Sequence, residues 1–155
     1  MTQDSTRRPR LTNDERRRRL LEIGVELLGE RSFWKLSARE VAERAGISVG
    51  LLYHYFSGIR PLYLASLKEL ASRLARATEW PPGVGLARGL QASLTAQVTF
   101  AASHSGAWRT LCGAGSPADP EVRAILRELR RVHVDRVLAG LAAGVPPAAA
   151  RLRLE

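Results

Sequence analysis

Residues 37–56 read SAREVAERAGISVGLLYHYF and carry the signals for two short helices joined by a tight turn. Ser37 is followed three residues later by Glu40, a capping-box spacing that predicts a helix start. Gly46 suits the left-handed residue that often ends a helix. Ser48 is then a suitable N-cap for a second short helix. Two helices at this spacing, with a glycine in the turn, predict a helix-turn-helix motif.

The second of these helices is the expected reading element. In a helix-turn-helix motif it enters the major groove of DNA with its N-terminal residues against base edges, while the first helix crosses the backbone. The apolar residues Ala42, Ala45 and Leu52 are instead expected to lock the two helices together. The candidate reading residues are Val49, Gly50, Leu51, Tyr53 and His54.

The rest of the sequence reads as further helices, without a convincing alternating pattern of a strand. Thr12 and Glu15 have the spacing of another capping box, which predicts a first helix ending near Arg31. Apolar periodicity interrupted by Pro and Gly clusters predicts the later helices. These are expected at about 62–77, 86–103 and 108–112, and from Asp119 onward.

The composition favours a polyanionic partner and argues against several kinds of site. A net charge of +9 suits nucleic acid, because cations that neutralise phosphates release counterions; the alternative is solvated surface charge. Cys112 is the single cysteine, so an internal disulfide is impossible, and we expect neither a metal nor a cofactor. No run of 18 apolar residues or signal-peptide core is present, which favours a cytoplasmic protein without membrane contact.

Residues 16–62 resemble the DNA-binding domain of the TetR/AcrR repressor family, and the run LYHYF at 52–56 is its most distinctive signature. The resemblance implies that Tyr53 and His54 face the major groove. It also implies that several side chains contact phosphates, or in the case of the arginine a base edge. These are Ser37, Arg39, Ser48 and Tyr55. The alternatives are that the serines act only as caps, that the tyrosine is partly buried and that the arginine is only solvated.

Two departures from the family pattern alter the expected contacts. Ile59 stands where the family usually has a lysine at the start of the fourth helix, so the neighbouring Arg60 is expected to replace that phosphate contact. Val49 and Leu51 stand where a lysine and a threonine are common in the reading helix. They cannot hydrogen-bond to bases but can pack on thymine methyl groups. The operator sequence is therefore not predictable from these residues.

In the resembling family the second half of the chain binds a small-molecule effector between helices, and binding releases the DNA. Phe100, His104 and Trp108 fall in the expected cavity region and are candidate ligand-lining residues. The alternative is that they belong to the core, where aromatic residues at helical spacing are more common. His104 and Cys112 have no third orienting group or oxyanion signature beside them, so we expect no enzymatic activity.

Together these observations predict an all-α, TetR-like fold in three segments. A disordered basic arm occupies 1–11, a three-helix helix-turn-helix DNA-binding domain 12–58, and a helical ligand-binding or regulatory bundle 59–155. Members of the resembling family are longer, and their last two long helices form the dimer interface. The bundle is therefore expected to lack most of the usual C-terminal dimerisation helices, which leaves the family's homodimer open.

Two functional hypotheses follow from the sequence. The first is a transcriptional repressor that binds a near-palindromic, double-stranded operator and is released by a small molecule. The second is a truncated family member that pairs with a longer relative, or that does not bind DNA. An exposed apolar stripe on the helix that begins near Asp119 would favour the second hypothesis.

Overall fold

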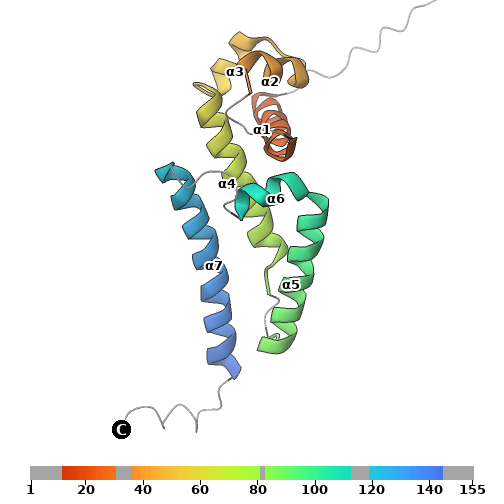
Figure 1. Cartoon of the computed structure of the whole chain (residues 1–155), viewed down its shortest axis with the longest axis vertical. Helices are drawn as coiled ribbons and strands as arrows, with labels where there is room; N and C mark the ends of the chain where they lie inside the picture. The colour runs from red at the N-terminus through yellow and green to blue at the C-terminus, as the bar shows by residue number, and fades with distance from the viewer. Residues whose placement is uncertain (1–11, 31–35, 81–82, 113–118, 145–155) are drawn as a thin grey trace, which may run out of the picture.

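The computed structural model describes residues 12–30, 36–80, 83–112 and 119–144 of the chain. These residues form seven helices, and none of them lies in a strand (Figure 1). The predicted all-α fold is confirmed, while the predicted basic arm at 1–11 lies outside the described residues. The helices are α1 (Asn13–Glu30), α2 (Ala38–Ala45), α3 (Val49–Tyr55), α4 (Ile59–Ala77), α5 (Leu86–Ser103), α6 (Ser105–Leu111) and α7 (Pro120–Gly144).

Side-chain caps fix the starts of α1 and α2 at the predicted residues. The Thr12 amide donates to Glu15 Oε2 at 2.7 Å, and the Glu15 amide donates to Thr12 Oγ1 at 3.3 Å. Ser37 and Glu40 form the same reciprocal pair before α2. α2 ends at Gly46, whose φ of 64° lies in the left-handed region that glycine adopts at little cost. Local signals therefore determine much of the geometry of this end of the molecule.

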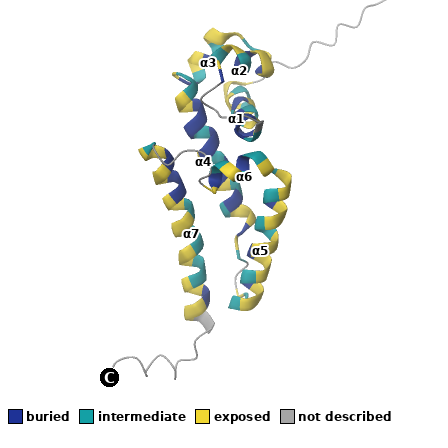
Figure 2. Ribbon diagram, viewed as in Figure 1, coloured by how far each residue is buried: buried dark blue, intermediate teal, exposed yellow. Residues whose placement is uncertain are grey.

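α4 connects the two halves of the molecule. It begins at Ile59 beside α3 and runs between α1 and the C-terminal helices (Figure 1). Pro61 lies in its first turn, where a helix residue has no intrahelical partner for its N–H in any case. The inner face is buried, with Leu62, Leu67 and Leu70 fully covered (Figure 2). One hydrophobic core therefore continues from the helix-turn-helix end into the bundle.

Glycines permit two close approaches within the bundle. α6, which begins earlier than predicted, crosses α1 where Gly106 lies against the backbone of Gly29. A Cβ at Gly106 would overlap the Gly29 carbonyl group. The indole ring of Trp80 lies against Gly89 of α5 and Gly140 of α7, and a Cβ at Gly89 would come within 2.6 Å of Trp80 Cε3. Both α5 and α7 therefore pack against the same indole.

α7 begins where predicted because Asp119 caps its first turn. Asp119 Oδ1 accepts hydrogen bonds from the amide of Glu121 at 2.9 Å and from that of Val122 at 3.4 Å. The predicted apolar stripe along α7 is buried only in its first half, where Val122 and Leu126 join the core. Further along the helix Leu141 is exposed. α7 therefore changes from a core helix into a surface helix along its length.

Candidate nucleic-acid interface

α3 buries one face and leaves the other open to solvent. Leu52 is fully buried and Phe56 is nearly so, which anchors the helix to the core. Ser48 caps the other end, because its Oγ accepts a hydrogen bond from the Leu51 amide at 3.1 Å. With one end capped and one side packed, the outward face of α3 has a fixed position.

The predicted reading residues lie together on α3 and at its outer surface. Tyr53, for example, is 51% exposed although it is a large aromatic residue. His54 meets the neighbouring Tyr55 ring edge-on, with 5.2 Å between ring centroids. Four of the five are exposed, namely Val49, Gly50, Tyr53 and His54, and Leu51 is half-buried. The placement is compatible with reading a groove, and the DNA contacts themselves stay a prediction.

The two predicted phosphate-binding serines both act as helix caps. Ser37 Oγ accepts from the Glu40 amide and also donates to Glu40 Oε2, both at 3.1 Å, so its hydroxyl proton is already engaged. Ser48 Oγ accepts from the Leu51 amide, which leaves its own proton outside the cap. The capping alternative therefore holds for both residues, and only Ser48 retains a donor for a phosphate without breaking a bond.

Arg39 and Tyr55 both lie at the surface with partners of their own. The Arg39 side chain is 82% exposed, and its Nε is 2.9 Å from Glu43 Oε1 one helical turn further on. Such exposed pairs contribute little stability, so the guanidinium can exchange partners readily. The hydroxyl of Tyr55, which is half-buried, donates to Asn13 Oδ1 at 3.1 Å and thereby ties α3 to the start of α1.

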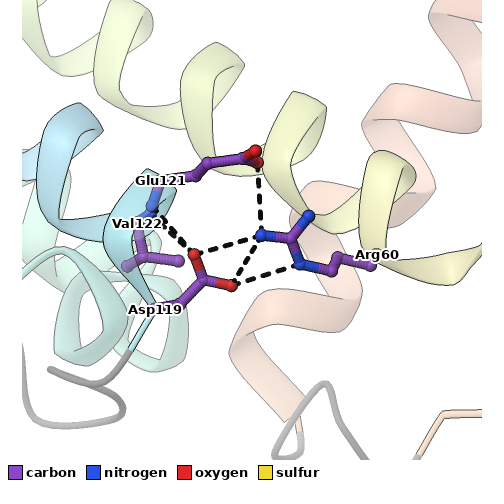
Figure 3. Close-up of polar contacts among 4 residues, drawn as sticks. All are labelled: Arg60, Asp119, Glu121 and Val122. Atoms are coloured by element: carbon purple, nitrogen blue, oxygen red, sulfur yellow. Dashed lines mark hydrogen bonds and ion pairs between the residues drawn. The ribbon is translucent and has the colours of Figure 1, made fainter.

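The guanidinium of Arg60, predicted to contact a phosphate, is held by carboxylates at the start of α7 (Figure 3). Its Nε and one terminal nitrogen reach Asp119 Oδ2 at 3.3 and 3.1 Å. The same terminal nitrogen lies 3.4 Å from Glu121 Oε2. The phosphate contact of Arg60 stays a prediction, and this cation also bridges the reading end and the bundle.

Asp119 remains ionised in this bridge. Burial alone would raise the pKa of the Asp119 carboxyl, but hydrogen bonds from the Glu121 amide and the Arg60 guanidinium outweigh it and hold the pKa below its ordinary value. The pKa of Tyr63 is raised, chiefly by burial and further by the negative charge of Asp119. The bridge is therefore an ion pair over the ordinary pH range.

Two contacts of α1 were not predicted from the sequence. Asn13 binds Tyr55 as described, and the Arg17 guanidinium lies over the Phe56 ring, 5.4 Å from its centroid. A cation over an aromatic face contributes a modest attraction. The basic cluster at the start of α1 is visible in the sequence, but its partners lie about forty residues away and only the fold brings them together.

A cavity of about 650 Å³ lies in the bundle, at some distance along the chain from the reading helix. Trp108, one of the candidate ligand-lining residues, lies at its wall, and a ligand there stays a prediction. Phe100 and His104 do not line it: Phe100 is buried with its ring stacked on His104, and His104 borders a separate hollow beside α1. The lining residues are Leu74, Gln97, Trp108, Leu111, Cys112, Arg123, Leu126, Leu129, Arg130, His133 and Val134.

The described residues contain no group of three or more His, Cys, Asp or Glu side chains placed to hold a metal ion. In the same part of the chain, no helix combines the length and the apolar character needed to cross a bilayer.

The N-terminal part of the chain matches a known protein family. Residues 20–66 match the family described as bacterial regulatory proteins, tetR family. The HTH-type transcriptional regulator BetI of Brucella canis is 28% identical over 130 residues, which cover 80% of this chain and 65% of BetI. The HTH-type transcriptional activator FasR of Mycolicibacterium smegmatis is 40% identical over 65 residues, covering 42% of this chain and 30% of FasR. The chain therefore spans just under two thirds of the BetI length.

Solved structures extend the similarity beyond the reading domain. A tetR-family transcriptional regulator from Streptomyces coelicolor superimposes with a TM-score of 0.76 at 30% identity, covering 89% of this chain and 63% of that one. A putative TetR-family regulator from Vibrio parahaemolyticus gives a TM-score of 0.67 at 26% identity, with 85% and 74% covered. These relatives are regulators, in line with the expectation that the chain is not an enzyme.

Proposed function

We propose that this chain, which belongs to the tetR family of bacterial regulatory proteins, binds double-stranded DNA through α2 and α3 and so regulates transcription. The observation that best supports this proposal is the exposed outer face of α3, held in place by buried Leu52 and by the Ser48 cap. A helix that enters a major groove must present its side chains at a fixed depth and angle.

We assign the base contacts to the outer face of α3. Tyr53 and His54 carry groups that can hydrogen-bond to base edges, whereas Val49 and Leu51 offer apolar contact to thymine methyl groups. Gly50 adds no side chain between them and so lets the helix backbone approach the DNA closely.

We assign phosphate contacts to the residues that flank this face. Ser48 keeps a hydroxyl proton to donate, and Arg39 and Tyr55 can exchange their present partners for a phosphate. Ser37 ranks below them, because its proton already binds Glu40. Arg60 is a conditional contact, since a phosphate there must displace Asp119 from the guanidinium.

We further propose that the chain acts as a repressor and that a small molecule in the bundle cavity releases it from its operator. The cavity lies between α4, α5, α6 and α7, and α4 leads directly to α3. FasR is described as an activator, so the regulatory sign must be measured. It depends on where the operator lies relative to the promoter, which in vitro transcription from the chain's own upstream region will show.

Fluorescence anisotropy with DNA from that upstream region tests the DNA-binding proposal. Affinity is expected to fall steeply between about 50 and 200 mM salt, because bound phosphates release counterions. Arg39→Ala should weaken binding about tenfold, while Arg127→Ala, which removes the same charge from an exposed site on α7, should not. Equal affinities for the two variants would show that the assigned face is wrong.

Exposed apolar side chains on α5 and α7 support a second proposal, that two copies of the chain pair through these helices. On α7, Val134, Leu138 and Leu141 recur at the spacing of one helix face, and Leu94 and Val98 do so on α5. Exposed apolar faces of this kind commonly mark protein contacts. Sedimentation at micromolar concentration should give a dimer, and Leu138→Glu should give a monomer. A wild-type monomer would instead favour pairing with a longer relative.

A further inference from the structure

The bundle cavity combines apolar walls with basic side chains on one helix. Arg123, Arg130 and His133 all lie on α7 and line the cavity. The intervals of seven and three residues place them along one side of that helix. No aspartate or glutamate is among the residues that line the cavity. The apolar walls come from Leu74, Trp108, Leu111, Leu126, Leu129 and Val134.

The acidic residues of α7 are engaged elsewhere. Glu128 and Asp135 both pair with Arg131, at 2.6 and 3.1 Å, and these three side chains are well exposed. Arg130 uses its Nε to donate to the Leu126 carbonyl at 3.3 Å, which leaves its terminal amino groups for another partner. Glu128 and Asp135 therefore do not occupy the terminal amino groups of Arg130 at the cavity wall.

His133 lies in the same wall, with both ring nitrogens in contact with protein oxygens. Its Nδ1 lies 2.8 Å from the Leu129 carbonyl oxygen, which can only accept. Its Nε2 lies 3.0 Å from Thr78 Oγ1, and this buried hydroxyl is itself 2.8 Å from the Leu74 carbonyl. Thr78 Oγ1 also accepts a hydrogen bond from Arg136 at 3.0 Å, so the side of the cavity wall at His133 is held by contacts within the protein.

We propose that the cavity takes an apolar anion, with its apolar body against Trp108 and the leucines and its carboxylate, sulfonate or phosphate group at the terminal amino groups of Arg130. The inference rests on the proposed role of this cavity as the effector site and specifies the chemistry of its ligand. A volume of about 650 Å³ lies within the range of small-molecule sites. Arginine suits the anionic group because it donates two parallel hydrogen bonds.

Two dyes that differ by one group provide the test. Anilinonaphthalene sulfonate is an apolar anion, and N-phenyl-1-naphthylamine has the same rings without the sulfonate. On the full chain, the sulfonate dye should bind about tenfold or more tightly than the neutral dye, since hydrogen bonds to charged groups are the stronger ones. Equal affinities, or no binding of the sulfonate dye, would overturn the proposal.

The alkylation rate of Cys112 distinguishes dye bound in this cavity from dye bound on the exposed apolar face of α5 and α7. It is the only cysteine, it is exposed, and it lines the cavity. The sulfonate dye should therefore slow alkylation of the chain by iodoacetamide, a neutral reagent, at concentrations that match the binding curve. Binding without protection of Cys112 would place the dye elsewhere and contradict the assignment.

Matched arginine variants test the charge. Arg130→Gln should weaken binding of the sulfonate dye about tenfold while leaving the neutral dye unchanged, and Arg130→Lys should restore part of the difference. Arg127→Gln, exposed and not part of the cavity lining, should change neither dye. Equal losses for Arg130→Gln and Arg127→Gln, or equal losses of both dyes, would overturn the proposal.

The same samples distinguish failure of this inference from failure of the proposed function. DNA affinity measured without dye tests the reading face alone. A chain that binds its DNA but rejects the sulfonate dye refutes the anion site only. The dye could also bind and protect Cys112 while the affinity of the chain for its DNA stays unchanged. That result would support the anion site and refute its role as an effector site.

Discussion

The helix-turn-helix end and the bundle are held together in different ways. α2 and α3 are short, and each begins at a serine whose side chain accepts a backbone hydrogen bond. The N-cap residues of α4, α5 and α6 are Gly58, Gly85 and His104, and none of them makes a side-chain cap. The caps support α2 and α3 locally, because helix nucleation is costly, whereas the equally short α6 depends on packing. In the bundle only the start of α7 has a side-chain cap among the described helices, so the bundle relies more on tertiary contacts than the reading end does.

Leu52→Ala should produce the largest effect, because it removes the packing that holds α3 to the core. The side chain is fully buried, and truncation of such a leucine typically costs about 3 kcal/mol. Chemical denaturation should show this loss of the free energy of unfolding. Arg127→Ala, at an exposed position on α7, is the control and should change it little. Similar losses in both variants would mean that the bundle end is as tightly packed as the reading end.

Gly106→Ala should come next and tests the contact between α6 and α1. The added methyl group would overlap the Gly29 carbonyl, so the two backbones must separate at a cost of about 2 kcal/mol. Gly29→Ala is the control, since its methyl group would lie 3.4 Å from the Ala107 nitrogen and needs only a small adjustment. Thermal unfolding of both proteins measures the difference, and a harmless Gly106→Ala would show that the crossing is loose.

Ser48→Ala should cost about 1 kcal/mol of stability, the usual value for an N-cap, and should also weaken DNA binding. Ser48→Asp tests which role matters, because aspartate caps a helix equally well but repels phosphates. It should retain stability and lose affinity for DNA. Recovery of both properties in Ser48→Asp would show that the serine acts on DNA only by holding α3.

The smallest effect is expected from the bridge between Arg60 and Asp119. The pKa of Asp119 is lowered in the folded chain, so its contribution is present above the ordinary value of 3.8 and is lost as the pH falls through the lowered pKa. Asp119→Asn should therefore flatten the acid limb of the stability profile. Asp14→Asn, an exposed acid at the start of α1, is the charge-matched control. Identical profiles for wild type and Asp119→Asn would show that the bridge does not contribute.

Prediction from sequence succeeded best at the helix-turn-helix end, where local signals determine the helices. Thr12, Ser37, Gly46 and Ser48 act through neighbours three or four residues away, so their spacing alone predicted the helix limits. The identity of the motif and the all-α fold followed from these local patterns and from the family resemblance. Trp108 was the one predicted ligand-lining residue that the cavity contains.

Contacts between distant residues were beyond the reach of sequence patterns. The bridge from Arg60 to Asp119 joins residues 59 positions apart, and no spacing rule relates them. The stacking of Phe100 on His104 occurs within a helical turn, but which face of α5 turns toward the cavity depends on packing against α4 and α7. Helical periodicity predicts that a face is apolar, not whether it meets a core, a cavity or solvent.

The contact between Gly106 and Gly29 has a mechanical consequence. Side chains in a helix contact can accommodate a displacement by changing rotamer. Here the two backbones touch directly, and no side chain lies between them. α6 carries Trp108 at the cavity wall and Gly106 against α1. A displacement of α6 would therefore move α1 directly, and α1 is tied to the reading helix through Asn13 and Tyr55.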